Sequence, residues 1–221
     1  MITPESERPY LFPEAEPNQA VDATLVHLYL PSATNETGLS RRSYLVTCAA
    51  YYLYDQGYTQ NLFMCVGDVW GPEYPDISSC AQKLLINWGV PLESIFAPTS
   101  GARSTVDEVD LFLTAAADRN WRSLASLAFG THFITIPSLY SSPVKTFSVE
   151  QVILSLGTPK ECELMANLLY SKHESFYLAY EITKLILDHL PLGKQVQRLL
   201  SSQRRKRPQG PSLWRSSDKD F

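Results

Sequence analysis

Residues 61–91, NLFMCVGDVWGPEYPDISSCAQKLLINWGVP, contain a complete unit of strand, loop and helix. The segment begins with a short apolar run that stops at Gly67-Asp68, a pair that favours a sharp turn. Such a run is typical of a parallel strand that is buried on both faces. A ligand would sit in the loop that follows, because ligands of open parallel sheets bind beyond the carboxyl ends of the strands.

The second half of this segment predicts an amphipathic helix. Asp76, Ser78 and Ser79 are each suited to cap its N-terminus, and Gly89 is suited to end it. Four apolar residues recur at helical spacing and predict the face that lies on the sheet: Cys80, Leu84, Leu85 and Trp88.

The neighbouring segments repeat this unit and predict an α/β protein. Further strands are expected at residues 22–30, 94–97 and 122–130, with helices that begin near Arg41 and at Thr105. The predicted fold is a Rossmann-like, doubly wound and mainly parallel sheet of four to five strands with a C-terminal helical extension. The expected buried faces of the two helices are Leu45, Cys48, Ala49, Tyr52 and Leu53, and Val106, Val109, Leu113 and Ala116.

The pattern changes after Pro143. Residues 146–156 fit either a last strand or a short helix, and helices are expected at 159–170, 174–189 and 193–202. The helix at 174–189 has one apolar face, which would cover the sheet or a protein partner. The expected organisation is a poorly ordered arm at 1–20, the Rossmann-like domain at 21–145, a helical extension packing on it at 146–202 and a disordered basic tail at 203–221.

The composition is that of an ordinary globular protein. Of 221 residues, 44% are hydrophobic and 19% charged, and no apolar run approaches the roughly 20 residues of a membrane span. No signal peptide is visible at the N-terminus, which is rich in glutamate and proline. The four cysteines form no CxxC pair and no histidine stands at zinc-ligand spacing, which favours buried thiols in a reducing compartment. We therefore expect a cytoplasmic protein without a metal site.

Charge is unevenly distributed along the chain. The formal net charge is -4, whereas the C-terminal run Arg204-Arg205-Lys206-Arg207 is basic. An acidic body argues against nucleic-acid binding by the main domain. The basic run itself resembles a nuclear-localisation or nucleic-acid patch, and a solvated tail is the alternative interpretation.

Polar residues are expected to gather where four loops meet at the carboxyl ends of the strands, at 32–42, 67–79, 98–105 and 130–135. His132 follows the strand at 122–130 and is the candidate general acid or base, because imidazole titrates near neutral pH. The candidates for binding a small polar ligand are Arg41, Arg42, Gly67, Asp68, Ser79, Ser104 and Thr105.

These candidates also have structural interpretations. A histidine at a strand end often only completes hydrogen bonds there, and Asp68 is either a turn residue or a ligand for a ribose hydroxyl or a metal ion. Paired arginines at a helix start are commonly solvated, although Arg41 or Arg42 would suit a bidentate phosphate contact. Ser104 caps its helix whether or not an anion binds at the helix N-terminus.

Common catalytic and nucleotide-binding motifs are absent from the chain, which has no GxGxxG, GxxxxGK[ST], GxSxG or HExxH. The dinucleotide, P-loop, esterase and zinc-protease interpretations therefore lose their main support. Gly67 stands alone in its loop and is weak evidence for a phosphate cradle.

Several segments together resemble one family. They are CVGDVWGPEYP, NWGVP and STVDEV, with an arginine near the start of the first helix and a histidine after the fourth strand. In these features residues 22–141 are similar to the domain-of-unknown-function 218 family of YdcF-like, SanA-like and ElyC-like proteins. The resemblance implies a doubly wound domain with an adenosyl-type or other nucleotide ligand, in a pocket lined by Arg41 or Arg42, Gly67, Thr105 and His132.

The chain departs from the pattern of this family in three places. Gly67-Asp68 replaces two glycines after the second strand, and Thr135 replaces an arginine three residues after the histidine. Pro31-Ser32-Ala33 stands where the first strand of the family has a glycine-rich end. Loss of an arginine and gain of an aspartate both weaken phosphate binding, so the chain resembles a diverged member.

The predicted function is the binding of a small nucleotide-like or other polar ligand at the strand ends, with hydrolase or transferase chemistry by His132 as a hypothesis. The alternative is a non-catalytic interaction protein with a degenerate pocket. In that case the C-terminal helices and the basic tail would serve protein partners.

Overall fold

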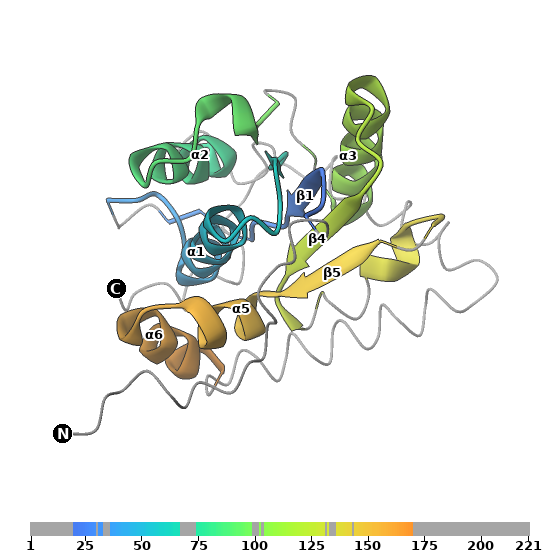
Figure 1. The fold of residues 1–221 in the computed structure, drawn as a ribbon. Helices are drawn as coiled ribbons and strands as arrows, with labels where there is room; N and C mark the ends of the chain where they lie inside the picture. The colour runs from blue at the N-terminus through green and yellow to red at the C-terminus, as the bar shows by residue number, and fades with distance from the viewer. Residues whose placement is uncertain are drawn as a thin grey trace.

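The fold is a parallel sheet between two layers of helices (Figure 1). Five strands are ordered β3-β2-β1-β4-β5, and all four strand pairings are parallel. This arrangement confirms the predicted doubly wound α/β fold. The computed structural model describes residues 20–29, 31–32, 36–66, 74–98, 102, 104–130, 132, 136–142 and 144–169.

β1 (Ala23–Val26) is the central strand, paired on one side with β2 (Leu62–Phe63) and on the other with β4 (Leu124–Ala128). β3 (Ile95–Phe96) and β5 (Lys145–Ser148) form the two edges. The strands are shorter than the apolar runs that predicted them. Apolar residues just beyond the strands, such as Met64 and Phe129, are also buried, so the apolar runs indicate burial and do not give the strand length.

α1 (Arg41–Asp55) and α2 (Ile77–Asn87) cover one face of the sheet (Figure 1). Among the three candidate caps of α2, Asp76 accepts a hydrogen bond from the Ser78 backbone N–H at 3.1 Å. The predicted buried faces are correct in part. Tyr52 of α1 is only half-buried. Cys80, Leu84 and Trp88 are also half-buried, because the stripe of α2 that faces the sheet is centred on Ile77, Ala81 and Leu85.

α3 (Thr105–Arg119) covers the other face and begins at the predicted N-cap, since the Ser104 hydroxyl accepts from the Asp107 N–H at 3.2 Å. Its predicted buried face is partly wrong, because Glu108 and Phe112 are buried in place of Val106 and Leu113. Contacts with residues in or next to the sheet determine which side of α3 faces inward. The ring of Phe112 packs against that of Phe63 at 5.4 Å, and Glu108 pairs with His27.

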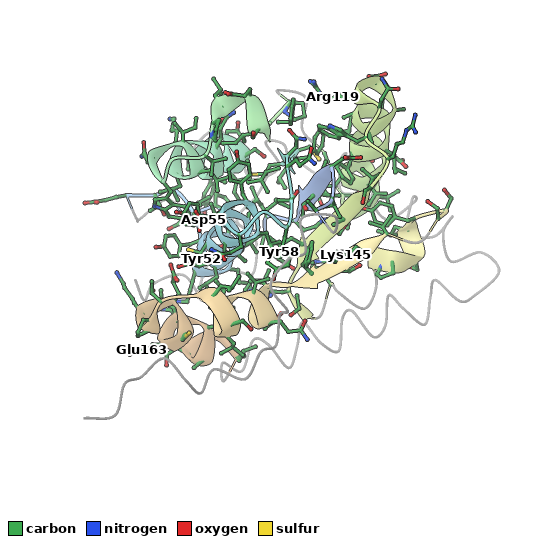
Figure 2. The ribbon with its side chains drawn as sticks, viewed as in Figure 1. Tyr52, Asp55, Tyr58, Arg119, Lys145 and Glu163 are labelled. Atoms are coloured by element: carbon green, nitrogen blue, oxygen red, sulfur yellow. The ribbon has the colours of Figure 1, made fainter. Side chains whose placement is uncertain are left out.

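The segment at 146–156 contains both structures that its sequence allowed, because β5 runs directly into α5 (Val149–Leu156). α6 (Pro159–Leu169) follows and confirms the helix expected from residue 159. The Tyr52 hydroxyl, which lies between α1 and α6 in Figure 2, donates to the Glu161 carboxylate at 2.7 Å. The arm before residue 20, the helices expected at 174–189 and 193–202, and the basic tail lie outside the described residues.

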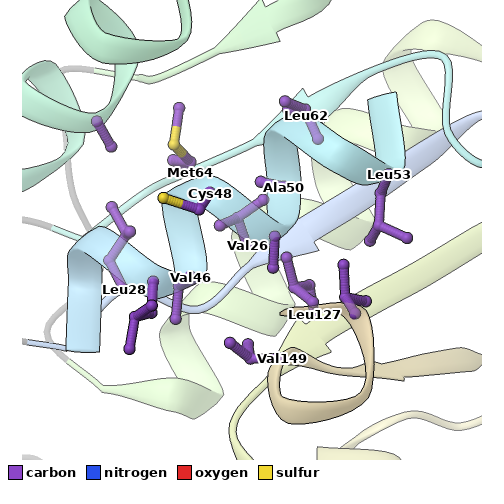
Figure 3. Packing of buried hydrophobic residues seen from close by; sticks show 14 of the residues in the cluster. Val26, Leu28, Val46, Cys48, Ala50, Leu53, Leu62, Met64, Leu127 and Val149 are labelled. Carbon is purple, nitrogen blue, oxygen red and sulfur yellow. The ribbon is translucent and has the colours of Figure 1, made fainter. Parts of the chain in front are cut away.

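The core is divided by the sheet into two apolar clusters. Residues of α1, α2 and α5 pack with Val26 and Leu127 on one face (Figure 3), and residues of α3 pack with Leu25 and Phe63 on the other. Successive residues of β1 therefore face opposite layers, as the pleat of a strand requires. None of the helices in the described part of the chain is long and apolar enough to cross a membrane.

Substituting a residue of the central strand should destabilise the fold far more than substituting an exposed leucine. Leu25 is completely buried, so Leu25→Ala should lower the free energy of unfolding by about 2–5 kcal/mol. Leu92 is 59% exposed, and Leu92→Ala should change it by less than about 0.5 kcal/mol. Urea denaturation of both variants measures the difference, and equal losses would contradict the assignment of β1 as the centre of the core.

Candidate functional site

The strand order places a topological switch point between β1 and β4. From β1 the chain proceeds outward to β2 and β3, then crosses back to β4 on the other side of β1. The connections that leave β1 and β4 therefore diverge at their carboxyl ends. Ligands of open parallel sheets bind at such a point, so the residues that follow Val26 and Ala128 are the candidate site.

Four side chains meet there, and we call them the switch-point cluster: Tyr29, Arg42, Phe129 and His132. The guanidinium carbon of Arg42 lies 5.6 Å from the ring centroid of Tyr29 and 5.5 Å from that of Phe129. The ring centroids of Tyr29 and His132 are 5.2 Å apart. Segments that follow two different strands and the first turn of α1 thus contribute to one group of side chains.

Arg42 is the member of the arginine pair that reaches the cluster. It is only 5% exposed, whereas Arg41, the first residue of α1, is half-buried. The start of α1 is set by Ser40, whose hydroxyl accepts from the Ser43 N–H at 3.4 Å. The Ser43 hydroxyl accepts in turn from the Tyr29 N–H at 3.1 Å. These bonds join the end of β1 to the first turn of α1, which places Arg42 against the Tyr29 ring.

Hydrogen bonds also fix the end of β4. The Phe129 N–H donates to the Tyr29 hydroxyl at 3.1 Å, and the Gly130 N–H donates to the Glu150 carboxylate at 2.6 Å. The other oxygen of Glu150 accepts from the Ser148 hydroxyl at 2.6 Å. A Cβ atom at position 130 would lie 3.0 Å from the Glu150 oxygen, so glycine allows this close contact. Sequence reasoning did not identify Tyr29 or Glu150, because neither belongs to a recognisable motif.

A second polar pair lies on the α3 face of the same strand end. His27 directly follows β1, and its Nδ1 is 2.5 Å from a carboxylate oxygen of Glu108, in the first turn of α3. Both residues are buried, with 3% of His27 and 8% of Glu108 exposed. Sequence reasoning treated His27 as part of a strand. The available signal was a titratable residue within an apolar run, DATLVHLYL.

The remaining predicted residues take separate positions. Ser104 is the N-cap of α3, and Thr105 is its first residue and half-buried. Ser79 lies in the first turn of α2, where its hydroxyl donates to the Asp76 carboxylate at 2.5 Å. Gly67 and Asp68 lie outside the described residues. The structure thus brings Arg42 and His132 together through Tyr29 and uses Ser79 and Ser104 at helix N-termini. A ligand-binding role for each candidate stays a prediction.

Cys65 lies on the α3 face, close to the His27–Glu108 pair. Its thiol lies 3.7 Å from the backbone carbonyl oxygen of Glu108, to which it donates. Burial, together with the negative charge of Glu108, raises the pKa of the Cys65 thiol. A thiol with a raised pKa is a poor nucleophile. Within the described ranges no group of three or more histidine, cysteine, aspartate or glutamate side chains is arranged to hold a metal ion.

Comparisons of the chain with protein-family models, with curated proteins and with solved structures found no match. The resemblance drawn from the sequence motifs therefore stays a prediction.

The four cysteines should differ in their reactivity towards iodoacetamide at pH 8. Burial raises the pKa of the Cys48 and Cys65 thiols, so the reactive thiolate is scarce at this pH. Cys80 and Cys162 are half-buried and should react at least about tenfold faster in the native protein. Mass spectrometry of tryptic peptides measures the rates. Rapid native labelling of Cys65 would contradict its assignment as an inert core residue.

Proposed function

We propose that this chain binds a small anionic ligand of nucleotide-like chemistry at the switch point between β1 and β4. The observation that carries the proposal is the position of Arg42, whose guanidinium lies against the rings of Tyr29 and Phe129 beyond the ends of both strands. Because a guanidinium loses favourable hydration when it is buried, an arginine in such a place is commonly used for its charge.

The chemistry of the cluster suits this class of ligand. Arginine forms paired hydrogen bonds with phosphate and carboxylate groups, and aromatic rings offer faces on which a planar base stacks. The imidazole of His132 lies beside Tyr29 in the same cluster. Because imidazole can serve as an acid or base, this position supports hydrolase or transferase chemistry as the accompanying hypothesis.

The resemblance to the domain-of-unknown-function 218 family points to the same residues. Arg42 and His132 occupy two of the positions that the resemblance assigns to the pocket, and both belong to the switch-point cluster. We therefore propose that the chain is a diverged relative of that family and that an adenosyl-type or nucleotide ligand is the first to test.

The alternative, a non-catalytic interaction protein, is favoured by two exposed leucines on the C-terminal helices. Leu154 of α5 is 55% exposed and Leu169 of α6 is 42% exposed. Such residues suit a contact with a protein partner or with the rest of this chain. Because this contact would leave Arg42 without a role in binding, a ligand screen separates the two functions.

Phosphate-bearing ligands should raise the melting temperature of the wild type, since a ligand that binds only the folded state stabilises it by mass action. For a nucleotide that binds, Arg42→Met should weaken the affinity about ten- to hundredfold, the effect of losing one or two charge-assisted hydrogen bonds. His132→Ala should also weaken binding. A thermal-shift screen of nucleotides, adenosyl compounds and sugar phosphates, followed by titration calorimetry, measures both effects.

Arg119→Met is the matched control for this experiment. Arg119 also stacks on an aromatic ring, with its guanidinium carbon 4.0 Å from the ring centroid of Phe96, but it stands at the C-terminal end of α3 (Figure 2). Its removal should leave the affinity unchanged. An equal loss in the Arg42 and Arg119 variants, or no shift of the wild type with any anion, would count against the proposal and favour the interaction protein.

A further inference from the structure

His27 carries a buried nitrogen that the fold does not use. Its Nδ1 is paired with Glu108, whereas its Nε2 has no hydrogen-bond partner among the groups of the described structure, and only 3% of the residue is exposed. Buried polar atoms are nearly always hydrogen-bonded, because an unmade bond costs the full desolvation of the group. An unpartnered Nε2 is therefore a sign that another molecule completes it.

The pair with Glu108 determines what Nε2 requires. The Glu108 carboxylate 2.5 Å from Nδ1 accepts a proton carried by that nitrogen, and in this tautomer of the imidazole the lone pair is on Nε2. Such an atom needs a donor, and a hydroxyl or an N–H group satisfies it. An anionic oxygen does not.

Neighbouring donors on this face already have partners. The Cys65 thiol donates to the backbone carbonyl of Glu108, and the hydroxyls of Ser126 and Tyr140 bond to each other at 2.6 Å. Cys65 is the closest of these to His27 by strand register. The pairing of Thr24 with Leu62 and of Leu25 with Phe63, continued by two residues, sets His27 beside Cys65.

The position of His27 connects it with the proposed ligand site. His27 follows the last residue of β1, and its backbone N–H still donates to the Leu127 carbonyl of β4 at 3.1 Å. Tyr29, two residues later, meets Arg42 on the α1 side. The end of β1 therefore presents an acceptor on its α3 side and an anion-binding group on its α1 side.

We propose that Nε2 of His27 accepts a hydrogen bond from a hydroxyl group of the ligand, with Glu108 as the residue that positions the imidazole. This inference rests on the proposed anion binding and specifies its substrate class. The ligand is a phosphorylated compound that carries a free hydroxyl, such as a sugar phosphate or the ribose phosphate of a nucleotide. His27 is then a specificity-determining residue, and Arg42 provides the affinity for the anionic group.

The test compares the affinities of the full chain for glycerol 3-phosphate and ribose 5-phosphate with those for propyl phosphate and inorganic phosphate, by titration calorimetry. The hydroxyl-bearing compounds should bind the wild type roughly tenfold more tightly than propyl phosphate, the effect of one hydrogen bond to an otherwise unpaired buried group. The double variant His27→Phe/Glu108→Leu removes both partners and leaves no buried charge. It should lose this preference and keep the affinity for propyl phosphate.

Tyr140→Phe is the control, because it breaks another buried hydrogen bond on the same face, to Ser126, and should lower stability without changing the preference. Proton–nitrogen NMR of the labelled wild type measures the Nε2 resonance of His27 directly. A pair with only a structural role would leave this resonance unchanged when a ligand binds. The Nε2 resonance of His27, assigned among four histidines with the double variant, should shift with ribose 5-phosphate and not with inorganic phosphate.

The outcomes separate the two proposals. If the phosphates bind but show no preference for hydroxyl groups, or if the double variant keeps the preference, the role of His27 is overturned and anion binding stands. If the Nε2 resonance does not respond to a hydroxyl-bearing ligand that binds, a trapped water or a structural role explains the pair. If no phosphate compound binds the wild type, the proposed function fails, and the assignment of His27 fails with it.

Discussion

The pairing of β4 with β1 is the constraint on which the rest of the structure depends. Ala23 lies opposite Leu124 and Val26 opposite Leu127, so β4 lies beside the first strand and not beside the third, which precedes it in the chain. The chain must therefore cross the sheet through α3, on the face opposite to α1. A right-handed crossover requires this change of face. Both faces of β1 are then covered, and its four residues are buried.

Burial on both faces makes every polar group near the end of β1 costly unless it is paired. The structure meets this requirement with bonds between segments distant in sequence. The Tyr29 hydroxyl accepts from the N–H of Phe129, directly after β4, and Glu150 accepts from the N–H of Gly130. These bonds make the strand ends rigid, because each links two elements that the core already holds. A rigid set of groups at a switch point loses little entropy when a ligand binds.

Local signals in the sequence predicted the helices α1, α2, α3 and α6 well. Ser104 and Gly89 mark helix ends through hydrogen bonds or backbone angles that involve near neighbours, so they could be identified without a tertiary structure. The strand limits could not, since an apolar residue such as Phe129 is buried just beyond the pairing region. The sequence predicted a mainly parallel sheet but not the order of its strands, because that order depends on contacts between distant segments.

The candidate site was predictable only where one residue type stood out. His132 was recognisable from its place after a strand, and the arginine pair from its place at a helix start. The choice of Arg42 over its neighbour depends on the rotation of α1 against Tyr29, which the sequence pattern leaves open. Glu108 stands in the segment STVDEV, which was used only for the family resemblance. Its partner lies 81 positions away, so neither residue alone indicated a buried pair.

The two sides of the β1 end differ in charge, and this difference would orient a ligand. Arg42 brings a positive charge to the α1 side, whereas the α3 side holds the Glu108 carboxylate behind His27. In the low dielectric of a buried site, an anion is attracted to the first and repelled by the second. A ligand with one anionic and one neutral polar end therefore has a single favourable orientation, with its anionic end against α1. A ligand with an anionic group at each end would have to place one of them near Glu108, so charge alone would select against it.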